Sequence, residues 1–110
     1  MKYIKTFDST QGTQSIFGEY WKIKLKSKTY LKIASQKIDS ELSDIDINFI
    51  FNNLKMYKKY KYVYLVRYIS DNGLTWWRYE FDSSAFNKNI YYMGEIKIPD
   101  YEVDAYLYNL

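Results

Sequence analysis

Apolar and polar residues alternate most clearly over residues 19–26, and this two-residue period predicts a β-strand with one buried face. The other face continues as a row of four lysines, here called the lysine row: Lys22, Lys24, Lys26 and Lys28. Like charges placed side by side destabilise a sheet, so the presence of this row requires a structural or functional explanation. Lysines on an edge strand prevent another strand from pairing there, and this is the interpretation we favour. The alternative is that the row binds an anion.

Two helices are predicted in the middle of the chain. Apolar residues recur at helical steps over 29–42, although Thr29, Leu31 and Ile33 also fit a second strand; we favour the helix. Residues 43–46 are typical of a helix start, because a serine hydroxyl accepts a backbone N–H and aspartate suits the positive end of a helix. The apolar steps that follow predict a helix over 44–58. Lys55, Lys58 and Lys59 complement the negative C-terminus of this helix. Together with one lysine of the following strand they form a second basic patch: Lys55, Lys58, Lys59 and Lys61.

A β-hairpin is predicted over 61–81, because two strand-like runs, 61–69 and 75–81, flank the turn sequence Ser-Asp-Asn-Gly-Leu. A two-residue Asn-Gly turn would fit, but a three-residue turn that pairs Ser70 with Leu74 separates the side chains more cleanly. One face then has Arg67 as its only charge, and we expect its other residues in the core: Val63, Leu65, Ile69, Trp77, Tyr79 and Phe81. The opposite face, here called the aromatic hairpin face, carries Tyr62, Tyr64, Val66, Tyr68, Trp76, Arg78 and Glu80.

The ends of the chain complete the predicted fold. Met1–Phe7 resembles a short strand and 8–15 a loop, while 89–98 resembles a strand that Pro99 ends. Residues 100–110 fit either a closing helix, with Val103, Tyr106 and Leu107 pointing inward, or a last strand. We therefore predict a single α+β domain over 1–110, in which a small antiparallel sheet of about four or five strands packs with two or three helices.

Composition agrees with a folded domain. A chain of 110 residues with 47% hydrophobic and 26% charged residues can bury a core and gives no indication of disorder. The unusual figure is 21% aromatic, including 14 tyrosines. Abundant Lys, Tyr, Ile and Asn track AT-rich codons, so the number of lysines is weaker evidence than their spacing. Codon bias and short length suggest an origin in a phage or a mobile element.

Several classes of protein are excluded by missing residues. The chain has no cysteine and no histidine, which rules out disulfides, zinc fingers and Ser-His-Asp triads. No apolar run reaches the ~20 residues of a membrane span, and residues 1–8 lack the apolar stretch of a signal peptide, so we expect a cytoplasmic protein. Two acidic sets could hold a hard cation but match no calcium loop: Asp44 with Asp46, and Asp100 with Glu102 and Asp104. We expect no metal, no cofactor and no enzymatic activity.

The aromatic hairpin face is the candidate binding surface. Its side chains are of the types enriched as anchors in protein interfaces: Tyr62, Tyr64, Tyr68, Trp76 and Arg78. Two alternatives remain for this face. A helix could cover it as a second core, or its rings could stack on unpaired bases while the lysine row and the second basic patch hold phosphates.

These observations predict a small, non-enzymatic binding protein that acts on a protein partner. The predicted partner is a nucleic-acid-processing or defence complex, on which the chain acts as an inhibitor or accessory factor of the anti-defence type. The alternative is a single-stranded nucleic-acid-binding protein or an accessory subunit of a replication enzyme.

Overall fold

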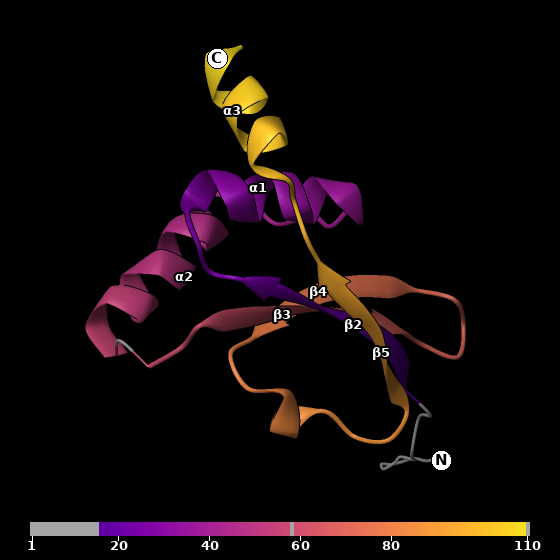
Figure 1. Ribbon diagram of the computed structural model, residues 1–110. Helices are drawn as coiled ribbons and strands as arrows, with labels where there is room; N and C mark the ends of the chain where they lie inside the picture. Colours follow the sequence, from indigo (N-terminus) through magenta and orange to yellow (C-terminus); the bar gives the residue numbers. More distant parts are fainter. Residues whose placement is uncertain (1–15, 58, 110) are drawn as a thin grey trace.

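The computed structural model describes the backbone of residues 16–57 and 59–109, and the side chains of the same residues apart from 54–57. In these ranges, four strands form one sheet in the order β4-β3-β2-β5, and three α-helices lie on one side of it (Figure 1). The predicted α+β class is therefore confirmed. The predicted strand over Met1–Phe7 and the loop over 8–15 lie outside the described residues.

The lysine-rich strand β2 (Phe17–Lys24) lies in the interior of the sheet. It pairs antiparallel with β3 (Tyr62–Ile69) on one side and parallel with β5 (Ile90–Ile96) on the other. Because both sides of β2 are hydrogen-bonded, its lysines do not protect a sheet edge, and that prediction was wrong. The parallel pairing also makes the sheet mixed, where we predicted an antiparallel one.

The β3–β4 hairpin has the predicted three-residue register. Ile69 faces Thr75, the first residue of β4 (Thr75–Glu80), and the Ser70 N–H donates to the Leu74 carbonyl at 2.9 Å. The turn closes with a bond of 3.0 Å from the Gly73 N–H to the Ser70 carbonyl. Gly73 has φ 84°, a conformation that favours glycine, so the turn residue itself selects this register.

Residues 28–37 form helix α1 (Lys28–Lys37), as favoured over a second strand. The Ser27 hydroxyl accepts the Tyr30 N–H at 3.0 Å and thereby caps the helix start. Since β2 ends at Lys24, the lysine row does not continue along one strand: Lys26 lies in the bend after β2, and Lys28 is the first residue of α1.

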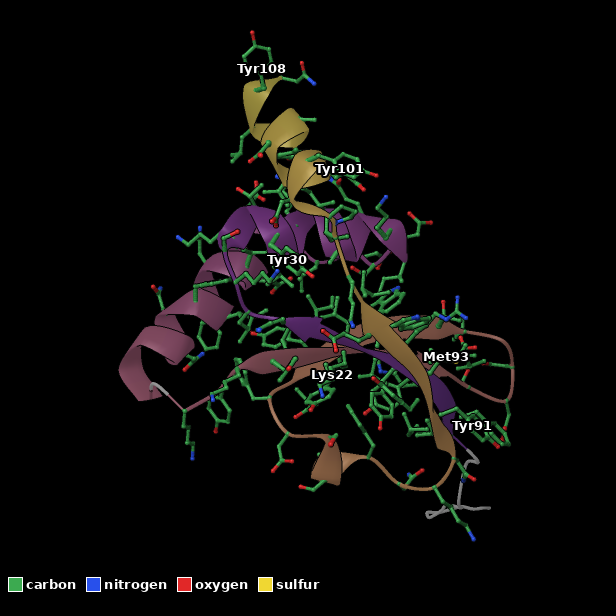
Figure 2. All side chains as sticks on the ribbon, viewed as in Figure 1. Lys22, Tyr30, Tyr91, Met93, Tyr101 and Tyr108 are labelled. Carbon is green, nitrogen blue, oxygen red and sulfur yellow. The ribbon has the colours of Figure 1, made fainter. Side chains whose placement is uncertain are left out.

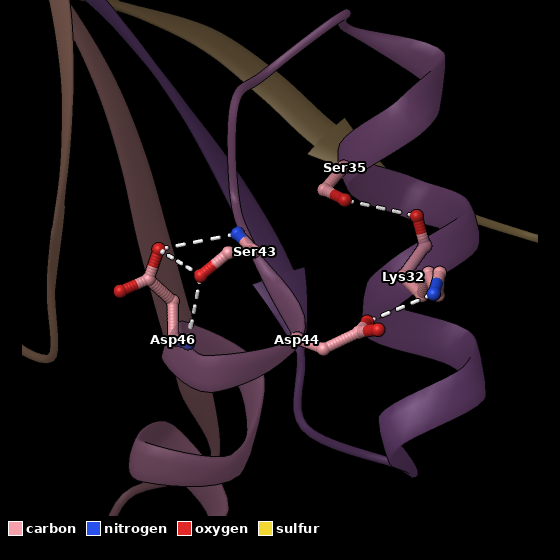
Figure 3. A network of polar contacts seen from close by, with 5 residues as sticks. All are labelled: Lys32, Ser35, Ser43, Asp44 and Asp46. Carbon is pink, nitrogen blue, oxygen red and sulfur yellow. Dashed lines mark hydrogen bonds and ion pairs between the residues drawn. The ribbon is translucent and has the colours of Figure 1, made fainter.

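Helix α2 (Asp44–Tyr57) begins where the Ser43 motif predicts. The Ser43 hydroxyl accepts the Asp46 N–H at 3.1 Å, and the Asp46 carboxylate accepts the Ser43 N–H at 3.1 Å in return (Figure 3). This reciprocal arrangement satisfies two backbone donors at the helix start. Lys32 of α1 binds Asp44 at 2.8 Å and holds the two helices together at this point. That hydrogen bond raises the pKa of Lys32.

The core lies between the helices and one face of the sheet. Leu31, Ala34 and Ile50 of the helices are fully buried against Ile23 and Val63 of the central strands. The hairpin face that we assigned to the core contributes Leu65, and Trp77, Tyr79 and Phe81 pack around the same cluster. The core assignment is therefore confirmed for these residues, but not for Ile69, which is half-buried and does not join the cluster. On the aromatic hairpin face, Val66 is fully buried.

The last helix, α3 (Asp100–Tyr108), extends away from the sheet and packs on α1 (Figure 1). Val103 and Tyr106 pack against the core as expected, and Lys37 of α1 forms an ion pair of 2.7 Å with Glu102. Leu107 is 50% exposed, so its predicted inward position was wrong. The helix follows Pro99 directly, which explains why the preceding strand cannot continue.

A connection over residues 81–89 crosses the sheet on the side opposite the helices. The connection has to cross a face of the sheet, because β4 and β5, which it joins, form the two edges of the described sheet. The connection contains a short 3-10 helix, η1 (Ser83–Ala85), which begins with a hydrogen bond of 3.0 Å from the Ser84 N–H to the Asp82 carboxylate. Figure 1 shows η1 on the far side of the sheet from α1 and α2.

Candidate functional site

The centre of the aromatic hairpin face is covered by the crossing connection. The ring of Phe86 lies 4.4 Å from Tyr20 of β2 and 6.3 Å from Tyr64 of β3, measured between ring centroids. Tyr20 also contacts Tyr92 of β5 at 5.2 Å, so the rings of three strands meet under Phe86. The α-helices in the described part of the chain all lie on the other side of the sheet, and none of them covers these rings.

The five predicted partner-binding residues do not form one patch. Tyr68 and Trp76 face each other across the hairpin with stacked rings 5.5 Å apart, and exposed Arg78 follows on the same face of β4. Tyr64 lies under Phe86 in the centre. Tyr62 is at the opposite end of β3, where the Lys22 ammonium sits 4.1 Å from its ring centroid. Only the Tyr68, Trp76 and Arg78 group is therefore near the hairpin turn.

Exposed apolar side chains gather at the same end of the sheet. Here called the hairpin end, this surface comprises residues that are 44% to 64% exposed: Phe17, Leu74, Tyr91, Tyr92 and Met93. The strand register places them at this end, because Phe17 faces Ile69 beside the turn while Tyr91 and Tyr92 lie beside residues 19 and 20 of the same strand β2. Consecutive strand residues point to opposite faces, so Phe17 and Tyr91 project on the helix side of the sheet and Tyr92 on the other side. Figure 2 shows Tyr91 and Met93 along β5, beyond the part of the sheet that the helices cover.

Strand β5 borders this surface with an edge that has no neighbouring strand among the described residues. Its residues 90–94 carry no charge, although charged side chains commonly protect edges. The register shifts between Tyr20 and Trp21, so Met93 is an extra residue in β5, and Gly94 takes φ 125° beside it. The bulge interrupts the regular pairing pattern of the edge.

One pair of charges at the hairpin end is neutralised within the protein. Arg67, the only charge on the core face of the hairpin, pairs with Glu19 directly opposite it on β2. Arg78 forms no ion pair with any other described residue. Loss of hydration raises the pKa of the Tyr68 hydroxyl, which agrees with its position in the half-buried ring stack. The surface therefore combines apolar side chains with one available guanidinium group.

The lysines predicted to contact an anion lie in several places. Lys22 is half-buried against Tyr62, and the rest of the lysine row is exposed: Lys24, Lys26 and Lys28. In the second basic patch, Lys59 and Lys61 are exposed, while the side chains of Lys55 and Lys58 lie outside the described part of the structure. Lys24 and Lys26 share a groove with Lys97, a residue that sequence reasoning did not select.

The predicted acidic sets have structural partners. Asp44 binds Lys32, Asp46 caps α2, and Glu102 binds Lys37. Among the described residues, no group of three or more carboxylates lies close enough together to hold a metal ion. Nor does any described helix combine the length and apolar content needed to cross a membrane.

Comparison with known proteins gives no match at any level: no family model, no curated protein and no solved structure is similar to this chain.

Sequence reasoning missed the residues that define the hairpin end. The run Ile90-Tyr91-Tyr92-Met93 is visible in the sequence as an uncharged aromatic strand. The exposure of Tyr91, Tyr92 and Met93 depends on β5 being an edge strand of the described sheet, which follows only from the order of strands. Phe86 was missed for a related reason, because a loop residue becomes a cover only once the loop is known to cross the sheet.

Proposed function

We propose that this chain is a non-enzymatic binding protein that docks a partner protein on its hairpin end. The observation that carries the proposal is the group of large apolar side chains exposed there: Phe17, Leu74, Tyr91, Tyr92 and Met93. Apolar patches of this kind mark interaction sites on the surfaces of folded proteins. The stacked Tyr68 and Trp76 rings lie at the same end of the sheet, toward its β4 edge, and supply a rigid anchor.

The available charge defines the chemistry of the partner. Arg78 has no carboxylate partner among the described residues, so we expect the partner to present an aspartate or glutamate beside an apolar side chain. The edge of β5, which pairs with no other strand of the described residues, supports a second contact, in which a strand of the partner extends the sheet. The partner's identity as part of a nucleic-acid-processing or defence complex, and a cytoplasmic location, stay predictions from the sequence.

A capture experiment with matched variants tests this proposal. The immobilised chain is incubated with nuclease-treated cell lysate, and we expect it to retain one protein in stoichiometric amount. Trp76→Ala should weaken the affinity of that purified protein about 30-fold or more, because interface tryptophans commonly contribute most of the binding energy. Tyr101→Ala is the control, since Tyr101 is 75% exposed but lies on α3. Its affinity should match that of the unmodified chain.

Two results would contradict the proposal. Equal affinity for Trp76→Ala and Tyr101→Ala, with both variants folded by circular dichroism, would show that the hairpin end is not the contact. Sedimentation of the purified chain gives the second test. If the chain forms a dimer that Tyr92→Glu dissociates, the surface serves a second copy of this chain and no separate partner is required.

A further inference from the structure

A groove with a volume of about 540 Å³ opens at the end of the sheet opposite the hairpin turn. The strand directions place it there: β2 and β5 are parallel and end on this side, while antiparallel β3 begins here. Three lysines line the groove: Lys24 and Lys26 at and just after the end of β2, and Lys97 directly after β5. The other lining residues used below are Tyr30, Tyr62 and Glu95.

The positive charge of this groove is not balanced within the described residues. Among the lining residues, three lysines face one carboxylate, Glu95, which also lies opposite Lys22 in the pairing of β2 with β5. Lys26 in addition lines a neighbouring pocket together with Asp100 and Asp104. None of the three lysines forms an ion pair with a described residue, whereas Lys32 and Lys37 elsewhere on the surface do. Clustered like charges raise the local potential, and a bound anion would lower it.

The wall that carries Lys97 is fixed by a buried tyrosine. The Tyr30 hydroxyl accepts the Ile98 N–H at 3.1 Å and donates to the Ile96 carbonyl at 3.4 Å. These two residues flank Lys97, so its backbone is held to helix α1 on both sides. Tyr30 is only 3% exposed and lies between α1 and the sheet (Figure 2). The groove therefore needs little rearrangement to receive a ligand.

Tyr62 supplies an aromatic surface next to the lysines. Its ring is half-buried, and the Lys22 ammonium lies 4.1 Å from the ring centroid, a cation–π contact that steadies the ring. A base can stack on such a ring only when it is unpaired, which separates single strands from duplexes. The chain has few arginines for reading base edges, as 14 of its 16 basic residues are lysine.

We propose that this groove binds the sugar-phosphate backbone of single-stranded nucleic acid. Lys24, Lys26 and Lys97 contact phosphates, and one base stacks on Tyr62. The site is distinct from the hairpin end and does not depend on the proposed protein partner. It differs from the contact set predicted from sequence, because Lys97 enters and Lys28, Lys59 and Lys61 do not line the groove.

Fluorescence anisotropy of a labelled oligothymidylate with the full chain tests this inference across a salt series. Three phosphate contacts predict a slope of about −2 for log K against log[salt]. The double variant Lys24→Gln/Lys97→Gln keeps one of the three contacts, so the magnitude of the slope should fall to about 0.7. Its affinity at 50 mM salt should be about 50-fold weaker. Lys59→Gln with Lys88→Gln removes the same charge from exposed sites outside the groove and should leave both values nearly unchanged. Absent binding at 50 mM salt, or equal losses in the two double variants, would overturn the proposal.

Tyr62 distinguishes a nucleic-acid strand from a free polyphosphate. Tyr62→Leu should weaken oligonucleotide binding about 5- to 100-fold, as loss of one base stack does, while Tyr62→Phe keeps the ring and the affinity. Tripolyphosphate, tested as a competitor, should bind both variants equally. If Tyr62→Leu leaves oligonucleotide affinity intact, the groove recognises phosphate alone, and the single-strand assignment is wrong. Either failure leaves the hairpin-end proposal standing, because none of these substitutions alters that surface.

Discussion

The two faces of the sheet are built from the same strands but packed by different means. On the helix side, aliphatic residues such as Ile23 and Val63 are fully buried under α1 and α2. On the other side, tyrosine rings lie under a single ring, Phe86, carried by a loop, beside the buried side chains of Val66 and Ile90. Aliphatic side chains pack closely in layers, whereas large rings remain partly accessible at their edges. We infer that the first face provides most of the stability, which leaves the second free to carry binding groups.

The largest expected effect comes from the helix side. Leu65 is 1% exposed and packs between the sheet and the helices, so Leu65→Ala should lower the free energy of unfolding by about 2–5 kcal/mol. Urea denaturation followed by circular dichroism measures this value. A loss below about 1 kcal/mol would mean that the helices do not cover this face tightly, and the contrast between the faces would disappear.

Removing the ring that covers the opposite face should have a smaller effect. Phe86→Ala deletes a half-buried ring and its contacts with Tyr20 and Tyr64, so we expect a loss of about 1–2 kcal/mol in the same denaturation experiment. The two freed rings should also show larger changes in their NMR chemical shifts than Tyr79, which lies on the helix side. A loss as large as that for Leu65→Ala would identify the aromatic face as a second core of equal weight.

The contrast between the faces could be predicted from sequence only in part. Alternation within each strand fixed which hairpin residues share a face, and the Gly73 turn fixed the register. The start of α2 follows from the local hydrogen bonds of Ser43 and was predicted, whereas α1 ends at Lys37, before the end predicted at residue 42. All of these features depend on residues that are close together in the chain.

Strand order was beyond this reasoning. The residues of β2 alone do not indicate that β5 pairs with it in parallel. That pairing makes β2 an interior strand and β5 an edge strand of the sheet that the structure describes. The prediction that the lysine row protects a sheet edge was wrong for this reason, because it required β2 to be an edge strand. The same pairing brings Lys97 to the groove with Lys24 and Lys26, so the candidate anion site also depended on a contact between distant segments.

The side-chain cap at the start of α2 should contribute less to the free energy of unfolding than the packing of either face of the sheet. Ser43→Ala removes the hydroxyl that accepts the Asp46 N–H at the start of α2, and it should lower the free energy of unfolding by about 1 kcal/mol. Asn52→Ala, an exposed change within the same helix, is the control and should stay within about 0.5 kcal/mol of the unmodified chain. Equal effects of the two substitutions would show that the Ser43 cap contributes nothing specific.

The smallest expected effect belongs to the loop that covers the aromatic face. The backbone hydrogen bond from Ser84 lowers the pKa of Asp82 below its usual value. Between the folded and unfolded pKa values the folded chain binds fewer protons, so this contribution is complete above about pH 4 and is lost as pH falls further. The melting temperature of the unmodified chain should therefore decline slightly more steeply below pH 4 than that of Asp82→Asn, whose amide can still cap η1 without titrating. The Ser84 amide resonance should follow the Asp82 titration in the unmodified chain only, and identical pH profiles in both proteins would mean that the loop cap carries no charge-dependent stability.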